Sequence, residues 1–176
     1  MLIKTVIAGF GGQGVLSMGL SLTQAAMLEG KNVTYLPSYG AEVRGGTANC
    51  TVAISDDEIA SPVASSPDFV IAMNQPSLRR FENQIQSGSL LFINSSLVEA
   101  KLSRGDVSIV SVPAGQIAEE LGSPKSANMV MLGAFTRKTG LVSLVSVIET
   151  LKDIMGTKQK LLAINEKALK AGYDLF

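Results

Sequence analysis

A group of glycines near the amino end of the chain has the spacing of a phosphate-binding turn. Gly9, Gly11 and Gly14 match the pattern G-x-G-x-x-G, and Gly12 and Gln13 lie inside it. Glycine permits a tight turn and lets a ligand approach the amide groups that a helix start leaves unpaired, where the helix dipole favours negative charge. A strand pattern precedes the turn and a helical pattern follows it. We therefore predict a phosphate-binding turn, with a simple close strand-to-helix turn as the alternative.

The second predicted strand, residues 32–36, ends without an acidic residue. An NAD site needs an Asp or Glu at this position to bind the ribose hydroxyls. Here Pro37 and Ser38 follow the strand, and the nearest carboxylates are Glu29, before the strand, and Glu42, in the next loop. NAD binding is therefore a minority interpretation, and another phosphate-bearing ligand fits better.

The loop over residues 37–49 is the second segment that could bind an anion. Its polar and glycine residues include Ser38, Glu42, Arg44, Gly45, Gly46 and Asn49. The Arg44 guanidinium offers paired donors suited to phosphate or carboxylate, and neighbouring glycines expose amide groups to the same anion. The alternative is a solvated pair of Glu42 and Arg44 on the surface.

The chain has one cysteine and no histidine. A single cysteine is too few for this chain to supply an iron–sulfur cluster, a thiol-rich zinc site or a disulfide framework. The lack of histidine excludes the usual histidine-based catalytic triads. Cys50 lies in an alternating strand pattern, where a half-buried strand residue is favoured over a catalytic thiol. If the protein serves an enzyme, we expect the bond-breaking chemistry to take place in other chains.

Length and composition predict a single α/β domain. The 176 residues are 46% hydrophobic and 17% charged, which suits one substantial core. Basic and acidic residues balance at 15 each, which gives no overall electrostatic case for nucleic acid or a membrane surface. With neither a cleavable signal nor a membrane-spanning stretch predicted, a cytoplasmic location is expected.

Strand and helix patterns alternate as in a three-layer αβα Rossmann-like fold with a mostly parallel sheet. The predicted strands are residues 2–8, 32–36, 47–54, 68–73, 89–93 and 107–112. The predicted helices are residues 12–29, 76–86, 116–121, 128–138, 142–155 and 158–170, so the C-terminal third is helical. A hairpin over Thr47 to Ser65 would make the sheet mixed. Right-handed crossovers would place the glycine turn and the 37–46 loop together at the carboxyl edge of the sheet.

Asn128 and Gly133 belong to the predicted helix 128–138. Asn128 is expected to bind backbone amides at the helix start rather than a ligand. Gly133 would let the helix pack closely on a neighbour, and Met129 and Met131 are expected to fill the core.

Three motifs together resemble the gamma subunit of 2-oxoacid:ferredoxin oxidoreductases. They are residues 9–14, residues 39–50 and residues 128–134, and the likeness spans nearly the whole chain. The 39–50 motif is the specific part, since its combination of Gly, Glu, Arg and Asn does not belong to ordinary nicotinamide enzymes. Ala41 stands where the common form of this loop has proline, a departure that affects loop stiffness more than chemistry.

The resemblance implies that residues 1–176 form a single gamma-type domain. The complex would convert a 2-oxoacid and coenzyme A to acyl-CoA, carbon dioxide and reduced ferredoxin. Thiamine diphosphate and [4Fe-4S] clusters would reside mainly in the partner alpha, beta and, where present, ferredoxin-like delta subunits. Pyruvate, 2-oxoglutarate and branched-chain acids all fit, with 2-oxoglutarate preferred. An isolated chain could form a homodimer through the surface meant for its partners.

The same resemblance divides the candidate residues into two groups, with no catalytic or metal-binding residue among them. The coenzyme A phosphates or adenosine end are assigned to Gly9, Gly11, Gly12, Gln13 and Gly14. A second wall or subunit contact is assigned to Ser38, Glu42, Arg44, Gly45, Gly46 and Asn49. The alternatives are a freestanding NAD or FAD oxidoreductase and a regulatory nucleotide-binding module.

Replacing Arg44→Ala tests the second group. If the guanidinium binds an anionic part of coenzyme A, the variant complex will need more coenzyme A for half-maximal rate and will assemble normally. Steady-state kinetics of the purified complex, with size-exclusion chromatography as the assembly control, measure both quantities. Unchanged kinetics would remove Arg44 from the site.

Overall fold

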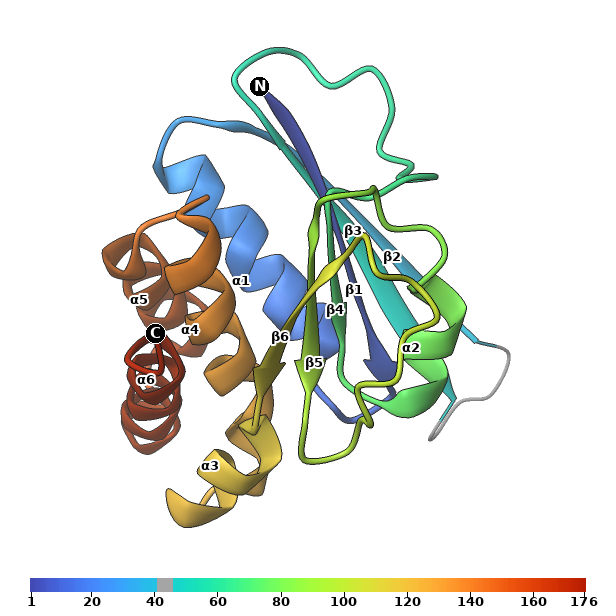
Figure 1. Cartoon of the computed structure of the whole chain (residues 1–176). Helices are drawn as coiled ribbons and strands as arrows, with labels where there is room; N and C mark the ends of the chain where they lie inside the picture. Colours follow the sequence, from blue (N-terminus) through green and yellow to red (C-terminus); the bar gives the residue numbers. More distant parts are fainter. Residues whose placement is uncertain (41–45) are drawn as a thin grey trace.

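A six-stranded mixed sheet forms the middle of the molecule (Figure 1). The structure is a computed structural model that describes residues 1–40 and 46–176. The strands are β1 (Leu2–Phe10), β2 (Asn32–Tyr39), β3 (Thr47–Ser55), β4 (Phe69–Ala72), β5 (Leu90–Asn94) and β6 (Ser108–Val112). Their order across the sheet is β2-β3-β1-β4-β5-β6. All the predicted strands are confirmed.

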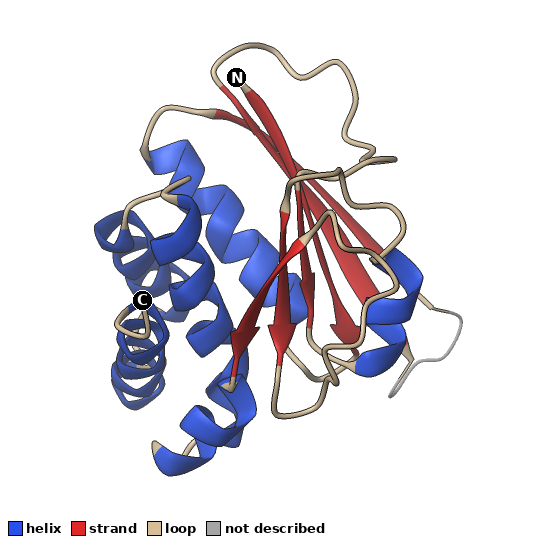
Figure 2. Cartoon of the chain, in the orientation of Figure 1, coloured by secondary structure: helices blue, strands red, loops and turns tan. Residues whose placement is uncertain are grey.

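Helices cover the two faces of the sheet unequally (Figure 2). They are α1 (Val15–Leu28), α2 (Gln75–Phe81), α3 (Ala114–Glu120), α4 (Ala127–Thr139), α5 (Leu144–Met155) and α6 (Gln159–Tyr173), with a 3-10 turn at Pro124–Ser126. One face carries α1, α4, α5 and α6, whereas the other carries α2 and loops. The predicted αβα arrangement and helical C-terminal third are confirmed. No helix within the described ranges is long and apolar enough to cross a membrane.

The central strands supply two hydrophobic cores. Ile7, Ile71 and Phe92 pack on the side of α1 and α4, while Val70 and Leu91 pack on the side of α2. The central strands are buried on both faces, as is usual for parallel strands in α/β proteins, which explains why β4 and β5 read as unbroken apolar runs.

The predicted hairpin over Thr47 to Ser65 is wrong. β3 is antiparallel to both of its neighbours, β1 and β2, and residues 56–68 contain no strand. Since β3 is inserted between β1 and β2, both of its edges are occupied and no edge is free to pair with the chain that follows. The sheet is therefore mixed because of β3, while β2 runs in the same direction as β1.

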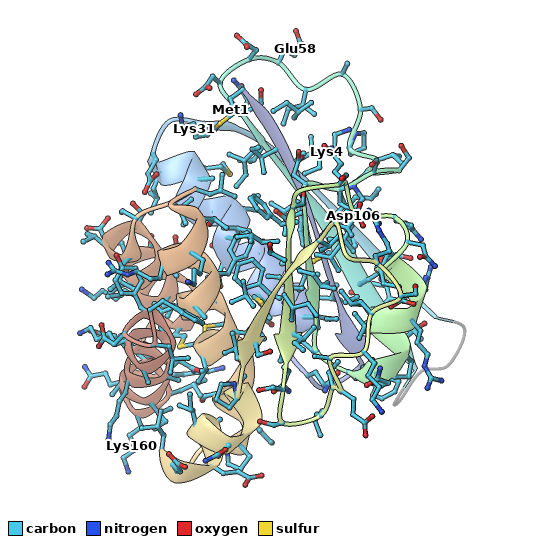
Figure 3. The ribbon with its side chains drawn as sticks, viewed as in Figure 1. Met1, Lys4, Lys31, Glu58, Asp106 and Lys160 are labelled. Carbon is cyan, nitrogen blue, oxygen red and sulfur yellow. The ribbon has the colours of Figure 1, made fainter. Side chains whose placement is uncertain are left out.

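The ion pairs around β1 lie at the edge of the sheet opposite the glycine turn. Lys31 Nζ is 2.5 Å from Asp56 Oδ1, and hydrogen bonding to Lys31 lowers the pKa of this carboxyl. Figure 3 shows Lys31 beside Met1, at the end where β1 begins. These ion pairs therefore do not hold the glycine turn, which lies at the carboxyl edge.

The Gln13 side chain joins the glycine turn to the end of β4. Its Oε1 accepts hydrogen bonds from the backbone amide of Phe10 (2.7 Å) and the side-chain amide of Asn74 (2.8 Å). Its Nε2 donates to the carbonyl of Met73 at 3.2 Å. Asn74 in turn caps α2, because its side chain accepts the amide of Ser77 at 2.9 Å. One amide side chain thus positions the starts of both α1 and α2.

Two glycines allow α4 and α6 to touch backbone to backbone. A Cβ built on Gly133 would lie 1.9 Å from the carbonyl oxygen of Leu169, and one on Gly172 would lie 1.8 Å from the carbonyl oxygen of Val130. No side chain fits at either position. The expectation that Gly133 permits close packing is therefore confirmed.

We predict that Gly133→Ala destabilises the protein by about 1–3 kcal/mol, the usual cost of overpacking, because the methyl group must push α6 away. Chemical denaturation of the purified chain measures the change. Gly105→Ala is the matched control, since a Cβ there meets nothing within 4 Å. Equal unfolding free energies for the two variants would contradict the close contact.

Gln13→Ala should lower the free energy of unfolding by about 2 kcal/mol, because it leaves two donors and an acceptor at the turn without their partner. Gln84→Ala serves as the control, since the Gln84 side chain makes one exposed hydrogen bond, to the carbonyl of Arg80. If both substitutions cost the same in denaturant titrations, the turn does not depend on Gln13.

Candidate functional site

The glycine turn leaves the first turn of α1 open to a ligand. Gly12 and Gly14 have φ values of 94° and 71°, in the region that favours glycine. A Cβ on Gly14 would also lie 2.3 Å from Nδ2 of Asn128. Both the backbone conformation and the lack of space therefore require glycine at this position. In the described part of the chain no side chain caps α1. The amide groups that begin the helix can therefore receive an anion.

The two glycine-rich segments meet at the carboxyl edge, as predicted. The Gly11 amide donates to the Gly46 carbonyl at 2.8 Å, and the Gly40 amide donates to the Thr47 carbonyl at 2.7 Å. Between them lies a pocket of about 360 Å³. Its walls are Phe10, Gly11, Gly12, Gly14, Val15, Leu16, Ser17, Tyr39, Gly46, Thr47 and Ala48. We call it the turn pocket.

The structure does not bring every predicted residue to the turn pocket. Ser38 and Asn49 are paired across β2 and β3, and strand alternation places them on the α2 face, whereas Tyr39 and Ala48 face the pocket. Asn49 borders a small hollow beside Arg80 instead. Gly9 lies beneath the turn, where a Cβ would meet Gln13 Oε1 at 2.7 Å. Glu42, Arg44 and Gly45 lie outside the described residues.

Gln13 is a structural residue of the site. Both of its polar side-chain atoms bind protein groups, as described above. It borders the larger cavity described next and is absent from the walls of the turn pocket. In this structure Gln13 holds the turn, and its assignment to ligand phosphates stays a prediction.

A second and larger cavity lies on the other side of the glycine turn. Its volume is about 560 Å³, and it is lined by Gly12, Gln13, Met73, Asn94, Ser96, Leu97, Gly115, Gln116, Glu119, Pro124, Lys125 and Ala127. We call it the strand-end cavity. Sequence reasoning missed Asn94, Ser96 and Lys125. The available signal was a polar residue directly after a buried apolar run, and Asn94, the last residue of β5, follows such a run.

Asn128 connects α4 to the glycine turn. Its Nδ2 donates to the Gly14 carbonyl at 3.2 Å, and its Oδ1 accepts the Met129 amide at 2.9 Å. The expected bond to a backbone amide near the helix start is confirmed, and the contact with the turn was not foreseen.

Cys50 is a buried core residue. Its thiol lies 3.7 Å from the Val15 carbonyl, and burial raises its pKa to about 12. A thiol with such a pKa stays protonated at neutral pH and is a poor nucleophile. The structural interpretation of Cys50 is confirmed.

Sequence comparison places the chain among ferredoxin-linked oxidoreductases. The family model described as "Pyruvate ferredoxin/flavodoxin oxidoreductase" matches residues 4–175. Ketoisovalerate oxidoreductase subunit VorA of Methanothermobacter thermautotrophicus is 42% identical over 98% of this chain and 36% of its own length. 2-Oxoglutarate synthase subunit KorC of the same organism is 39% identical over 96% of this chain and 92% of its own length. The chain thus spans about a third of VorA and nearly all of KorC.

Solved structures give the same result. The gamma subunit of a keto/oxoacid ferredoxin oxidoreductase from Geobacter sulfurreducens has a TM-score of 0.83 and 28% identity, covering 98% of this chain and 96% of that one. A 2-oxoglutarate:ferredoxin oxidoreductase from Magnetococcus marinus, with 2-oxoglutarate, coenzyme A and succinyl-CoA bound, has a TM-score of 0.91 and 26% identity, covering 99% of this chain and 31% of that one. The chain therefore belongs to the pyruvate ferredoxin/flavodoxin oxidoreductase family.

Proposed function

We propose that this chain is the gamma subunit of a 2-oxoacid:ferredoxin oxidoreductase and that it contributes to coenzyme A binding and subunit assembly. The complex would convert a 2-oxoacid, coenzyme A and two oxidised ferredoxins to acyl-CoA, carbon dioxide and two reduced ferredoxins. The observation that carries the proposal is the hydrogen bond between Gly11 and Gly46, which joins the first two of the three motifs of the family resemblance beside one pocket. We also propose a cytoplasmic location, because coenzyme A and ferredoxin are used there.

The turn pocket suits the nucleotide end of coenzyme A. Open amides at the start of α1 and the positive end of the helix dipole favour phosphate. The Tyr39 ring borders the pocket and is 73% exposed, so one face is available for stacking on adenine. None of the described residues that line this pocket is charged. The proposal that Arg44 supplies a positive charge to the ligand rests on the sequence motif, because Arg44 lies outside the described residues.

The electron-transfer chemistry of the proposed complex belongs to other subunits. The only cysteine of the chain is buried with a raised pKa, and the chain has no histidine, so these residues do not fit a [4Fe-4S] cluster. We propose that alpha and beta subunits, with a ferredoxin-like delta subunit where present, hold thiamine diphosphate and the clusters. Residues 1–176 would then act as a single domain beside them.

The relatives differ in the 2-oxoacid for which they are named. The relatives include proteins named for ketoisovalerate and for 2-oxoglutarate, at 42% and 39% identity. The alternative of a freestanding NAD enzyme is not favoured, since the family model matches residues 4–175.

The proposal is tested by purifying the tagged chain from its own cells and assaying the product with pyruvate, 2-oxoglutarate and 3-methyl-2-oxobutanoate. We expect brown, thiamine-containing partners to co-purify and one 2-oxoacid to reduce ferredoxin only when coenzyme A is present. A colourless, solitary protein, or oxidation that does not need coenzyme A, would reject the proposal.

Substitutions of Ser17 test in the same assay whether the turn pocket binds the phosphates of coenzyme A. Ser17 is the third residue of α1 and lines the turn pocket. Ser17→Asp should raise the KM for coenzyme A about tenfold by repelling phosphate, while an acid in the first turn leaves α1 stable or improves it. Ser17→Asn is the uncharged control and should stay close to the parent. Equal KM values for the two variants would move the phosphates away from the turn pocket.

A further inference from the structure

The strand-end cavity has the size of a small-molecule site. Its volume of about 560 Å³ falls within the range of about 300–1,000 Å³ that such sites occupy. Gly12 borders both this cavity and the turn pocket, so the two spaces adjoin across the glycine turn. A ligand held at the start of α1 could therefore extend into the strand-end cavity.

Asn94 brings a side-chain amide donor to this cavity. The residue is only 1% exposed, and its Oδ1 accepts the amides of Ser96 (3.4 Å) and Gly115 (3.3 Å). These two bonds fix which side-chain atom is the oxygen. Among the described residues nothing accepts a hydrogen bond from Nδ2, although Asn94 lines the cavity. A ligand in the cavity can accept the hydrogen of this donor.

The other groups around the cavity indicate what kind of ligand it would take. The Ser96 hydroxyl accepts the Gln116 amide at 3.0 Å, which leaves its own hydrogen free to donate. Lys125 and Glu119, both exposed, contribute opposite charges. The apolar wall consists of Met73, Leu97 and Pro124. Neutral donors, balanced charge and an apolar wall favour an uncharged chain that carries carbonyl oxygens.

We infer that the strand-end cavity binds the amide-bearing pantetheine arm of coenzyme A and that Asn94 Nδ2 donates to one of its carbonyl oxygens. This inference rests on the proposed function, since it places the nucleotide end of the same molecule in the turn pocket. The pantetheine arm is uncharged, elongated and partly apolar, and it contains two amide groups. Gly12, which has no side chain, is the point where the arm crosses the turn.

Asn94→Asp tests the inference with little disturbance of the fold. The aspartate keeps the oxygen that accepts the amides of Ser96 and Gly115, and it replaces only the donor that faces the cavity. Asn83→Asp adds the same charge at an exposed position after α2 and is the matched control. Thermal unfolding confirms that both variants are folded, and calorimetry on the purified complex measures binding of coenzyme A, pantetheine and 3′,5′-ADP.

We expect Asn94→Asp to weaken coenzyme A and pantetheine at least about fivefold and to leave 3′,5′-ADP within twofold of the parent, while Asn83→Asp changes none of them. If the parent complex binds neither coenzyme A nor 3′,5′-ADP, the proposed function itself fails. Binding of coenzyme A that is insensitive to Asn94→Asp overturns only the inference. Equal loss of 3′,5′-ADP and pantetheine would overturn it as well, because the nucleotide would then occupy the cavity.

Discussion

The Gln13 side chain is the interaction on which the carboxyl edge of the sheet depends. The chain leaves β1 toward α1 on one face and leaves β4 toward α2 on the other, which makes the crevice between these strands the usual ligand position of an open α/β sheet. Gln13 crosses that crevice and binds backbone or side-chain groups from both strand ends. The open spaces beside the crevice, the turn pocket and the strand-end cavity, lie on the two flanks of the glycine turn.

The inserted strand β3 explains why a dinucleotide motif can occur here without the rest of a dinucleotide site. Adjacent strands are about 4.8 Å apart, so the end of β2 lies two spacings, or about 10 Å, from β1. In a Rossmann domain the acidic residue that binds ribose follows a strand directly beside the first one. Even an acid at the end of β2 would be displaced by one strand. The missing acidic residue and the strand order are thus two independent arguments against NAD binding.

Local patterns predicted the parts of this structure that depend on local interactions. Apolar runs located the buried strands, and Gly133 pointed to a close helix contact because only a missing side chain permits one. The hairpin error arose because strand pairing is a long-range choice: the partners of β3 in β1 lie 37 to 53 residues earlier in the chain. The family resemblance assigns Ser38 and Asn49 to a second wall or subunit contact, but the face that each side chain takes depends on the pleat and register of the strands.

Asn94 and Lys125 show that sequence patterns also could not predict which residues share a cavity. They are about 30 residues apart in the chain, and only the parallel arrangement of β5 and β6 brings both to the strand-end cavity. No motif spacing contains this information. The cavity lining comes from strand ends and from the segments that lead into α3 and α4. A sequence pattern could identify each polar residue, but it could not show that they surround one space.

The third motif of the family resemblance, residues 128–134, has a physical reason to accompany the glycine turn. Asn128 at one end donates to the Gly14 carbonyl, which fixes the start of α1 from the side away from the sheet. Gly133, further along the same helix, brings α6 against the α4 backbone. The helical C-terminal third is therefore connected to the turn through a single rigid element. Displacing α6 would shift α4, and through Asn128 the amide groups that are available to a phosphate, so the motif links packing far from the pocket to the geometry of the pocket itself.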